Sequence, residues 1–237
     1  MLTHLFSLVA LFSLTVAKAG PSRIDTLEER QFGGFGRNRG GAAGGAAAGG
    51  NCPTLQMVVA RASTEPPGEG IIGAVADDVK QQVDGAESVA VDYPATLSNY
   101  FASEAEGVDE MTKLVEASAK NCPDSKIALL GYSQGAQVAG DTLCGLSAQA
   151  QGKVVAMIQM GDPTFNPGKE FDVGSSNKPG IFANQQADCL DDNAAIIQSF
   201  CDNGDTFCAS GASLATHLGY VREFGTEATD FVVQKAA

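Results

Sequence analysis

The sequence predicts an α/β fold, a three-layer sandwich in which a five-stranded parallel sheet is covered on both faces by helices. Five short apolar runs rich in Val and Ile recur along the chain, and stretches compatible with helix separate them. Runs that are almost continuously apolar are typical of strands buried on both faces. Strands that alternate with helices form parallel sheets. A serine between two glycines directly follows the third run, where open α/β sheets place their sites.

The strands and helices are assigned from these runs. We expect strands at LQMVVA (55–60), SVAVD (88–92), IALLG (127–131), VVAMIQM (154–160) and AAIIQSF (194–200). We expect helices at about 71–83, 100–120, 134–148 and 219–236. A dinucleotide-binding fold is the competing arrangement. It requires a Gly-x-Gly-x-x-Gly turn after the first strand, where this chain has ARASTEPPGEG (60–70).

The region before the first strand has the composition of processing and linker segments. Residues 1–19 resemble a secretory signal peptide, with an apolar run at 5–17 that is too short to span a bilayer and an Ala-Lys-Ala end. Residues 20–31 are polar and resemble a short fungal propeptide, and 32–50 form a Gly- and Ala-rich linker of low complexity. We therefore expect a secreted, extracellular protein without a membrane segment in its mature form, whose folded domain spans 51–237.

The charge of this domain excludes some partners. Residues 51–237 hold 10 Lys and Arg against 25 Asp and Glu, a net charge of −15. A strongly acidic domain repels nucleic acid and anionic membranes. Its charge is compatible with neutral polymers and small esters as partners. Separately, we expect a monomer.

The cysteines predict a disulfide framework. An even number of cysteines in an exported chain favours three disulfides, although six cysteines allow 15 pairings. Their spacing favours a local bridge between Cys201 and Cys208. No Cys-x-x-Cys pair is present and 51–237 contain a single histidine, so we expect no metal and no cofactor. The six cysteines are Cys52, Cys122, Cys144, Cys189, Cys201 and Cys208.

Ser133 is the candidate nucleophile. It stands in LLGYSQG (129–135), between a predicted strand and a predicted helix. Small residues on both sides allow a tight strand-to-helix turn that exposes the hydroxyl group, the geometry of a nucleophile elbow. The alternative is a structural serine that caps the helix.

A serine nucleophile needs a base, and the base needs an acid that orients it. His217 is the only histidine of the domain and follows the last predicted strand, which gives the chain order serine, acid, histidine found in α/β-hydrolases. Asp205 and Asp202 both lie in CDNGDTFC (201–208), directly after that strand. We favour Asp205 as the acid, but spacing alone does not separate the two.

The oxyanion of an ester-hydrolysis intermediate needs preorganised N–H donors. The residue after the nucleophile, Gln134, supplies one backbone N–H. The loop after the first strand supplies the second, and Ser63 is the candidate through its N–H and its hydroxyl group.

Taken together, these motifs resemble the cutinase and acetylxylan esterase family of secreted serine esterases. The resemblance implies a small α/β-hydrolase without a large lid, a triad of Ser133, Asp205 and His217, and an oxyanion hole at Ser63 and Gln134. It also implies a Cys52–Cys122 bridge, supports Cys201–Cys208, and leaves Cys144 with Cys189. The segments that carry it are NCP (51–53), ARASTE (60–65), NCPDSKIALLGYSQG (121–135), MGDPTF (160–165), CDNGDTFC (201–208) and ATHLGY (215–220).

Within that family, the motifs are more similar to acetylxylan esterases than to cutinases. DYPA (92–95) carries this similarity together with MGDPTF and ATHLGY. The loop ASGASLAT (209–216) is small and mildly polar, which suits an acetyl group on a sugar. A cutinase that acts on cutin polyester is the alternative, and an inactive esterase-like binding or wall protein is the alternative of another class.

Overall fold

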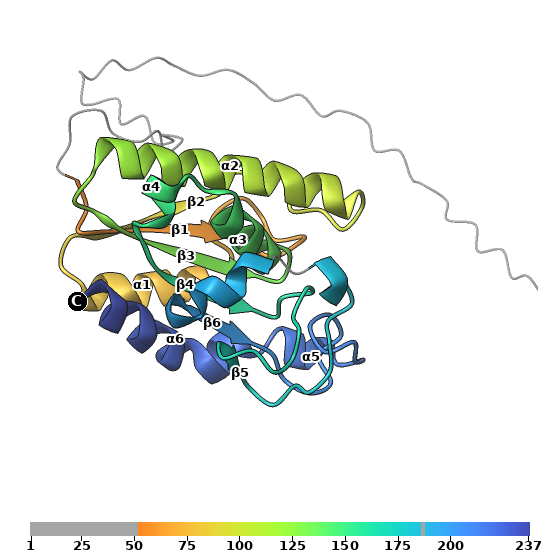
Figure 1. Ribbon diagram of the computed structural model, residues 1–237. Helices are drawn as coiled ribbons and strands as arrows, with labels where there is room; N and C mark the ends of the chain where they lie inside the picture. The colour runs from red at the N-terminus through yellow and green to blue at the C-terminus, as the bar shows by residue number, and fades with distance from the viewer. Residues whose placement is uncertain (1–51, 186–187) are drawn as a thin grey trace, which may run out of the picture. The chain divides into compact units, whose positions relative to one another are not determined.

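The computed structural model describes residues 52–185 and 188–237 (Figure 1). The expected signal peptide (1–19), propeptide (20–31) and linker (32–50) lie outside the described residues. The remainder forms the α/β fold that the sequence predicts.

A parallel sheet forms the centre of the fold, with strand order β2-β1-β3-β4-β6-β5. All five predicted strands are present. The expectation of a five-stranded sheet is wrong by one strand, because a two-residue edge strand, too short to leave a pattern in the sequence, pairs with β6. The strands are β1 Leu55–Ala60, β2 Ala86–Ala90, β3 Lys126–Tyr132, β4 Val154–Met160, β5 Asp172–Val173 and β6 Ile197–Phe200.

Helices cover both faces of the sheet (Figure 1). Helices α1 and α6 pack together on one face, and α2 and α3 on the other. The predicted helix at 134–148 ends earlier, and a separate turn follows it that Ser147 caps by accepting a hydrogen bond from the Ala150 N–H. The helices are α1 Gly73–Gln82, α2 Tyr100–Asn121, α3 Gln134–Gly145, α4 Ala148–Gln151, α5 Leu214–His217 and α6 Tyr220–Ala236.

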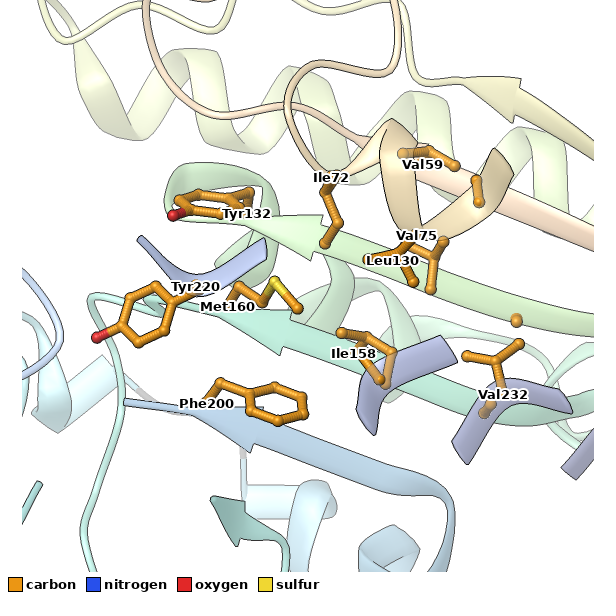
Figure 2. Close-up of a cluster of buried hydrophobic side chains, with 14 of the residues drawn as sticks. Val59, Ile72, Val75, Leu130, Tyr132, Ile158, Met160, Phe200, Tyr220 and Val232 are labelled. Atoms are coloured by element: carbon orange, nitrogen blue, oxygen red, sulfur yellow. The ribbon is translucent and has the colours of Figure 1, made fainter. Parts of the chain in front are cut away.

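Two apolar cores lie on opposite faces of the sheet because side chains alternate along a strand. In β1, Val59 belongs to the core under α1 and α6, whereas Val58 belongs to the core under α2 and α3. Figure 2 shows the first core, with Val75 of α1 and Val232 of α6 beside the strand residues. The rings of Tyr132 and Tyr220 lie at one end of this cluster, and their hydroxyl oxygens point away from the apolar side chains.

One predicted strand is much shorter than expected. In AAIIQSF (194–200), only the last four residues are extended, and Asp188–Ile196 forms a 3-10 helix, η2. Leu190 on η2 is buried in the core under α3, and the neighbouring Cys189 is bonded to Cys144 of α3. The apolar residues before β6 therefore belong to a segment that packs on α3 and do not extend the sheet.

Helices α2 and α3 meet through two carboxyl groups. Glu104 of α2 is 8% exposed and lies within hydrogen-bonding distance of Asp141 of α3, while its Oε1 atom has no partner among the described residues. Burial, and then the charge of Asp141, raise the pKa of Glu104 to about 8. The pair therefore shares a proton at neutral pH.

Glu104→Gln should remove a loss of stability at high pH. A carboxyl group whose pKa is raised by folding contributes its stability below its ordinary pKa, and this contribution is lost as the pH rises toward about 8. We expect the variant to match the wild type at pH 4 and to be more stable at pH 9 by on the order of 2 kcal/mol, the size of the penalty for a buried unpaired group. Urea unfolding at the two pH values measures this.

Glu106→Gln is the matched control, because Glu106 lies on the same helix with an exposed side chain. It should keep the wild-type dependence of stability on pH. The stability of Glu104→Gln could fall as the pH rises, in parallel with that of the wild type. That result would contradict a proton shared between Glu104 and Asp141.

Candidate active site

Ser133 lies on a tight turn between β3 and α3. Its backbone has φ 54° and ψ −118°, and its side chain does not cap α3, so the helix-capping interpretation does not hold. A Cβ atom on Gly131 would lie 2.1 Å from the carbonyl oxygen of Gly135, and one on Gly135 would lie 2.1 Å from that of Ala60. Because β1, β3 and α3 approach so closely here, both flanking positions require glycine. This is the geometry of a nucleophile elbow.

His217 and Asp205 form a buried pair. The Nδ1 atom of His217 lies 2.9 Å from Oδ2 of Asp205, and the two residues are 4% and 0% exposed. The other carboxylate oxygen, Oδ1, accepts hydrogen bonds from the N–H groups of Phe207 (2.6 Å) and Cys208 (2.9 Å). Burial raises the pKa of Asp205, but the hydrogen bond and charge of His217 and the two N–H donors outweigh burial and hold the pKa below its usual value. Asp205 is therefore a carboxylate throughout the neutral range.

Asp202, the competing acid, is placed differently. Its Oδ1 atom accepts hydrogen bonds from the N–H (2.8 Å) and hydroxyl (2.6 Å) groups of Ser175. Within the described part of the chain its carboxylate makes no hydrogen bond or ion pair with His217. The geometry therefore pairs the imidazole with Asp205.

Two tyrosines that the sequence analysis missed fix this pair. The hydroxyl group of Tyr220 donates to Oδ2 of Asp205 (2.8 Å) and accepts from the N–H of Asp202 (2.9 Å). The hydroxyl group of Tyr132 donates to the backbone carbonyl of His217. Tyr220 stands three residues after His217 and Tyr132 directly before Ser133, so proximity to the motifs is the only signal that the sequence offers for them.

All six cysteines are joined in three disulfides, Cys52–Cys122, Cys144–Cys189 and Cys201–Cys208. These are the pairs that the family resemblance implies. The third bridge closes the loop that carries Asp205, and the Asp205 backbone also forms a bridge with Ser213 in the segment before His217. Asp205 is therefore held in place by the disulfide that closes its own loop and by the backbone bridge to Ser213.

Removing the Cys201–Cys208 disulfide should lower kcat more, and stability less, than removing Cys52–Cys122. In the chain-entropy relation, a bridge across a separation of 7 residues contributes about 2.5 kcal/mol, and one across 70 contributes about 4.4 kcal/mol. We expect Cys201→Ser/Cys208→Ser to lose most of its kcat at temperatures where it is still folded. The control Cys52→Ser/Cys122→Ser should lose more stability and keep its kcat.

Thermal unfolding and ester turnover of both variants, with mass mapping of the unreduced protein, measure this. Equal losses of kcat in the two variants would argue that the Cys201–Cys208 disulfide does not position Asp205. A free thiol at Cys201 or Cys208 in the wild type would argue the same.

Ser133 and His217 face the same region without a direct hydrogen bond. Ser133 and Phe207 line one pocket, and the Phe207 ring packs edge-on against the imidazole, with centroids 4.5 Å apart. Among the described residues no hydrogen bond joins the Ser133 hydroxyl group to His217. In unliganded enzymes this contact is often long and tightens when substrate binds.

The candidate oxyanion donors are Ser63, in the loop after β1, and Gln134, the first residue of α3. Within the described residues, neither the N–H of Ser63 nor that of Gln134 donates to a protein acceptor. The side chain of Gln134 is held firmly, because Oε1 accepts from Ser103 (3.2 Å) and Nε2 donates to the carbonyls of Tyr100 (3.1 Å) and Thr96 (3.3 Å). The Oγ atom of Ser63 is buried without a partner in this part of the chain. Both N–H groups therefore remain candidates for the oxyanion hole.

The pocket beside Ser133 has a volume of about 170 Å³ and a mainly apolar lining. The small, mildly polar loop 209–216, which in the sequence suits an acetyl group, does not line this pocket. Its walls come from segments far apart in the sequence. Besides Ser133 they are Leu97, Tyr100, Pro163, Ile181, Phe182 and Phe207.

Within residues 52–185 and 188–237, no cluster of three or more His, Cys, Asp and Glu side chains could hold a metal ion. No helix in these residues is long and apolar enough to cross a bilayer.

Comparisons with known proteins place this geometry among esterases. The family model described as "Cutinase" matches residues 51–236. Acetylxylan esterase 2 of Talaromyces purpureogenus is 34% identical over 78% of this chain and 88% of its own, and cutinase 11 of Verticillium dahliae is 31% identical over 78% and 70%. A solved acetylxylan esterase structure superposes with a TM-score of 0.74 at 34% identity, covering 79% of this chain and all of the other.

Proposed function

The chain belongs to the cutinase family and is a carboxylic ester hydrolase, and from this premise we propose that it removes acetyl groups from xylan at Ser133. The observation that carries the proposal is the buried His217–Asp205 pair, whose imidazole packs against Phe207, a residue that lines one pocket with Ser133 on its tight turn. A serine hydroxyl, an imidazole and a carboxylate in this order are the parts of a serine esterase.

In the proposed mechanism, the imidazole of His217 accepts the proton of the Ser133 hydroxyl group as Oγ attacks the ester carbonyl carbon. The N–H groups of Gln134 and Ser63 stabilise the resulting oxyanion. The imidazolium then gives its proton to the leaving sugar oxygen, and an acetyl group remains on Ser133. Water, activated by the same imidazole, releases acetate. Asp205 orients the imidazole and stabilises its charged form.

The preference for acetyl esters rests on two supports. Two of the similar proteins described above, one of them a solved structure, are named acetylxylan esterases. The pocket beside Ser133 is also small, with a volume of about 170 Å³. A short acyl group suits such a space better than the long chains of a wax-like polyester.

A cutin hydrolase is the second candidate, and one observation favours it. Leu97 and Ile181 line the pocket and are 56% and 45% exposed, and Phe101 beside them is 48% exposed. An exposed apolar rim suits adsorption to an apolar polymer. The relative named as a cutinase is consistent with this candidate.

The two candidates are separated by their products. The purified protein should release acetate from acetylated xylan at least tenfold faster than hydroxy fatty acids from cutin, with Ser133→Ala as the blank for both. The reverse ratio would favour the cutin hydrolase. Release of neither product, together with no labelling of Ser133 by a fluorophosphonate, would favour an inactive binding protein.

We also propose that the enzyme is exported and acts outside the cell as a monomer. The proposal rests on the signal-like segment 1–19 and on three disulfides, which are typical of oxidising compartments. Residues 20–31 would be removed as a propeptide and 32–50 would remain as a linker. The mass and N-terminal sequence of the secreted protein test each boundary.

A further inference from the structure

Phe182 and Tyr100 both line the pocket beside Ser133. Phe182 belongs to the connection between β5 and β6, whereas Tyr100 and Phe101 begin α2. Its ring centroid lies 5.2 Å from that of Tyr100 and 5.1 Å from that of Phe101, and those two rings are 5.4 Å apart. Three aromatic rings therefore join two walls that are more than 80 residues apart in the sequence.

The wall that Phe182 contacts is fixed to the nucleophile elbow. The Tyr100 hydroxyl group donates to Gln137 of α3 (3.0 Å), and the Tyr100 carbonyl accepts from the side chain of Gln134 (3.1 Å). Gln134 follows Ser133 directly. Tyr100 is therefore held in place relative to the reacting hydroxyl group.

The segment that carries Phe182 is fixed as well. The N–H of Phe182 donates to the carbonyl of Pro163 (2.8 Å), and the N–H of Ile181 donates to that of Phe207 (2.9 Å). Pro163 and Phe207 themselves line the pocket. Because hydrogen bonds anchor both residues, the contact between Phe182 and Tyr100 is a fixed part of the pocket wall.

The volume of the pocket limits the length of the acyl chain that fits in it. A volume of about 170 Å³ is well below the roughly 300 Å³ at which pockets hold drug-sized ligands, so it suits a short acyl group. An acetyl or butyryl group fits this space and an octanoyl chain exceeds it. Removing the Phe182 ring would extend the pocket toward Phe101 and the exposed edge of α2.

We propose that Phe182 is the specificity-determining residue that restricts this esterase to short acyl groups. This inference rests on the proposed function, since it takes Ser133 as the nucleophile and the pocket as the acyl site. The ring acts by occupying space. Shortening it therefore changes which esters are cleaved, and the triad itself stays intact.

The test compares kcat/KM on p-nitrophenyl acetate, butyrate and octanoate. We expect the wild type to prefer acetate over octanoate, and Phe182→Ala to raise the octanoate-to-acetate ratio at least tenfold, roughly the effect of a pocket that accommodates extra methylenes. Phe182→Leu should give an intermediate ratio and serves if the alanine variant does not fold. Phe101→Ala is the control, because Phe101 belongs to the same ring cluster but does not line the pocket, and it should change the ratio less than threefold.

Each outcome decides a separate point. The wild type could cleave p-nitrophenyl acetate while both Phe182 variants keep the wild-type octanoate-to-acetate ratio. That result would overturn the inference and leave the proposed function standing. An effect of Phe182→Ala on acetates of longer alcohols, with no effect in the acyl series, overturns the acyl assignment of the pocket. A wild type that cleaves no ester contradicts the proposed function and this inference together.

Discussion

Ser133→Ala should abolish ester hydrolysis and leave the fold intact. The expected loss in kcat is roughly 10⁶-fold, the scale of nucleophile removal in a serine hydrolase. The Ser133 hydroxyl group makes no hydrogen bond that caps α3, so its removal takes little from packing or from the helix. Alanine has the same difficulty as serine in adopting φ 54°, so the strain of the turn is unchanged.

Turnover of p-nitrophenyl acetate, thermal unfolding and fluorophosphonate labelling measure this together. The variant should unfold within about 2 °C of the wild type, as expected for a ΔΔG of a few tenths of a kcal/mol. A folded variant with near wild-type turnover would rule out Ser133 as the nucleophile.

The features that were predictable from the sequence are those encoded locally. The strand runs 55–60 and 154–160 keep their predicted bounds, because a continuous apolar run flanked by turn residues has few other ways to be buried. The elbow was also predictable, since Gly131 and Gly135 stand where any side chain would meet backbone atoms.

The features that were not predictable depend on contacts between distant segments. Tyr220 is an ordinary apolar position of α6 in the sequence, and only the folded chain brings its hydroxyl group to the carboxylate of Asp205. The pocket lining was also missed. The small residues before His217 suggested a polar rim, whereas Leu97 and Phe182 reach Ser133 from other parts of the chain. A pattern within one segment does not carry such information.

Asp205→Asn should cost about 10⁴ in kcat with little change in fold, because an amide can hold the imidazole in the wrong tautomer and does not stabilise its charged form. Phe207 N–H and Cys208 N–H can still donate to the amide oxygen, so the loop keeps two of its hydrogen bonds. Asp205 itself is ionised in the neutral range, because its pKa lies below the usual value.

Asp202→Asn is the control that separates the two acids of one loop. Its carboxylate contacts Ser175 and not His217, and an asparagine oxygen can accept the same hydrogen bonds. We therefore expect less than a tenfold change in kcat and an unchanged pH profile. The comparison is measured as kcat for both variants between pH 4 and pH 9 on one ester. If Asp202→Asn inactivates the enzyme and Asp205→Asn does not, the acid assigned here is wrong. The buried pair would then be a structural ion pair that fixes the loop, and the base that activates Ser133 would have to be oriented by Asp202.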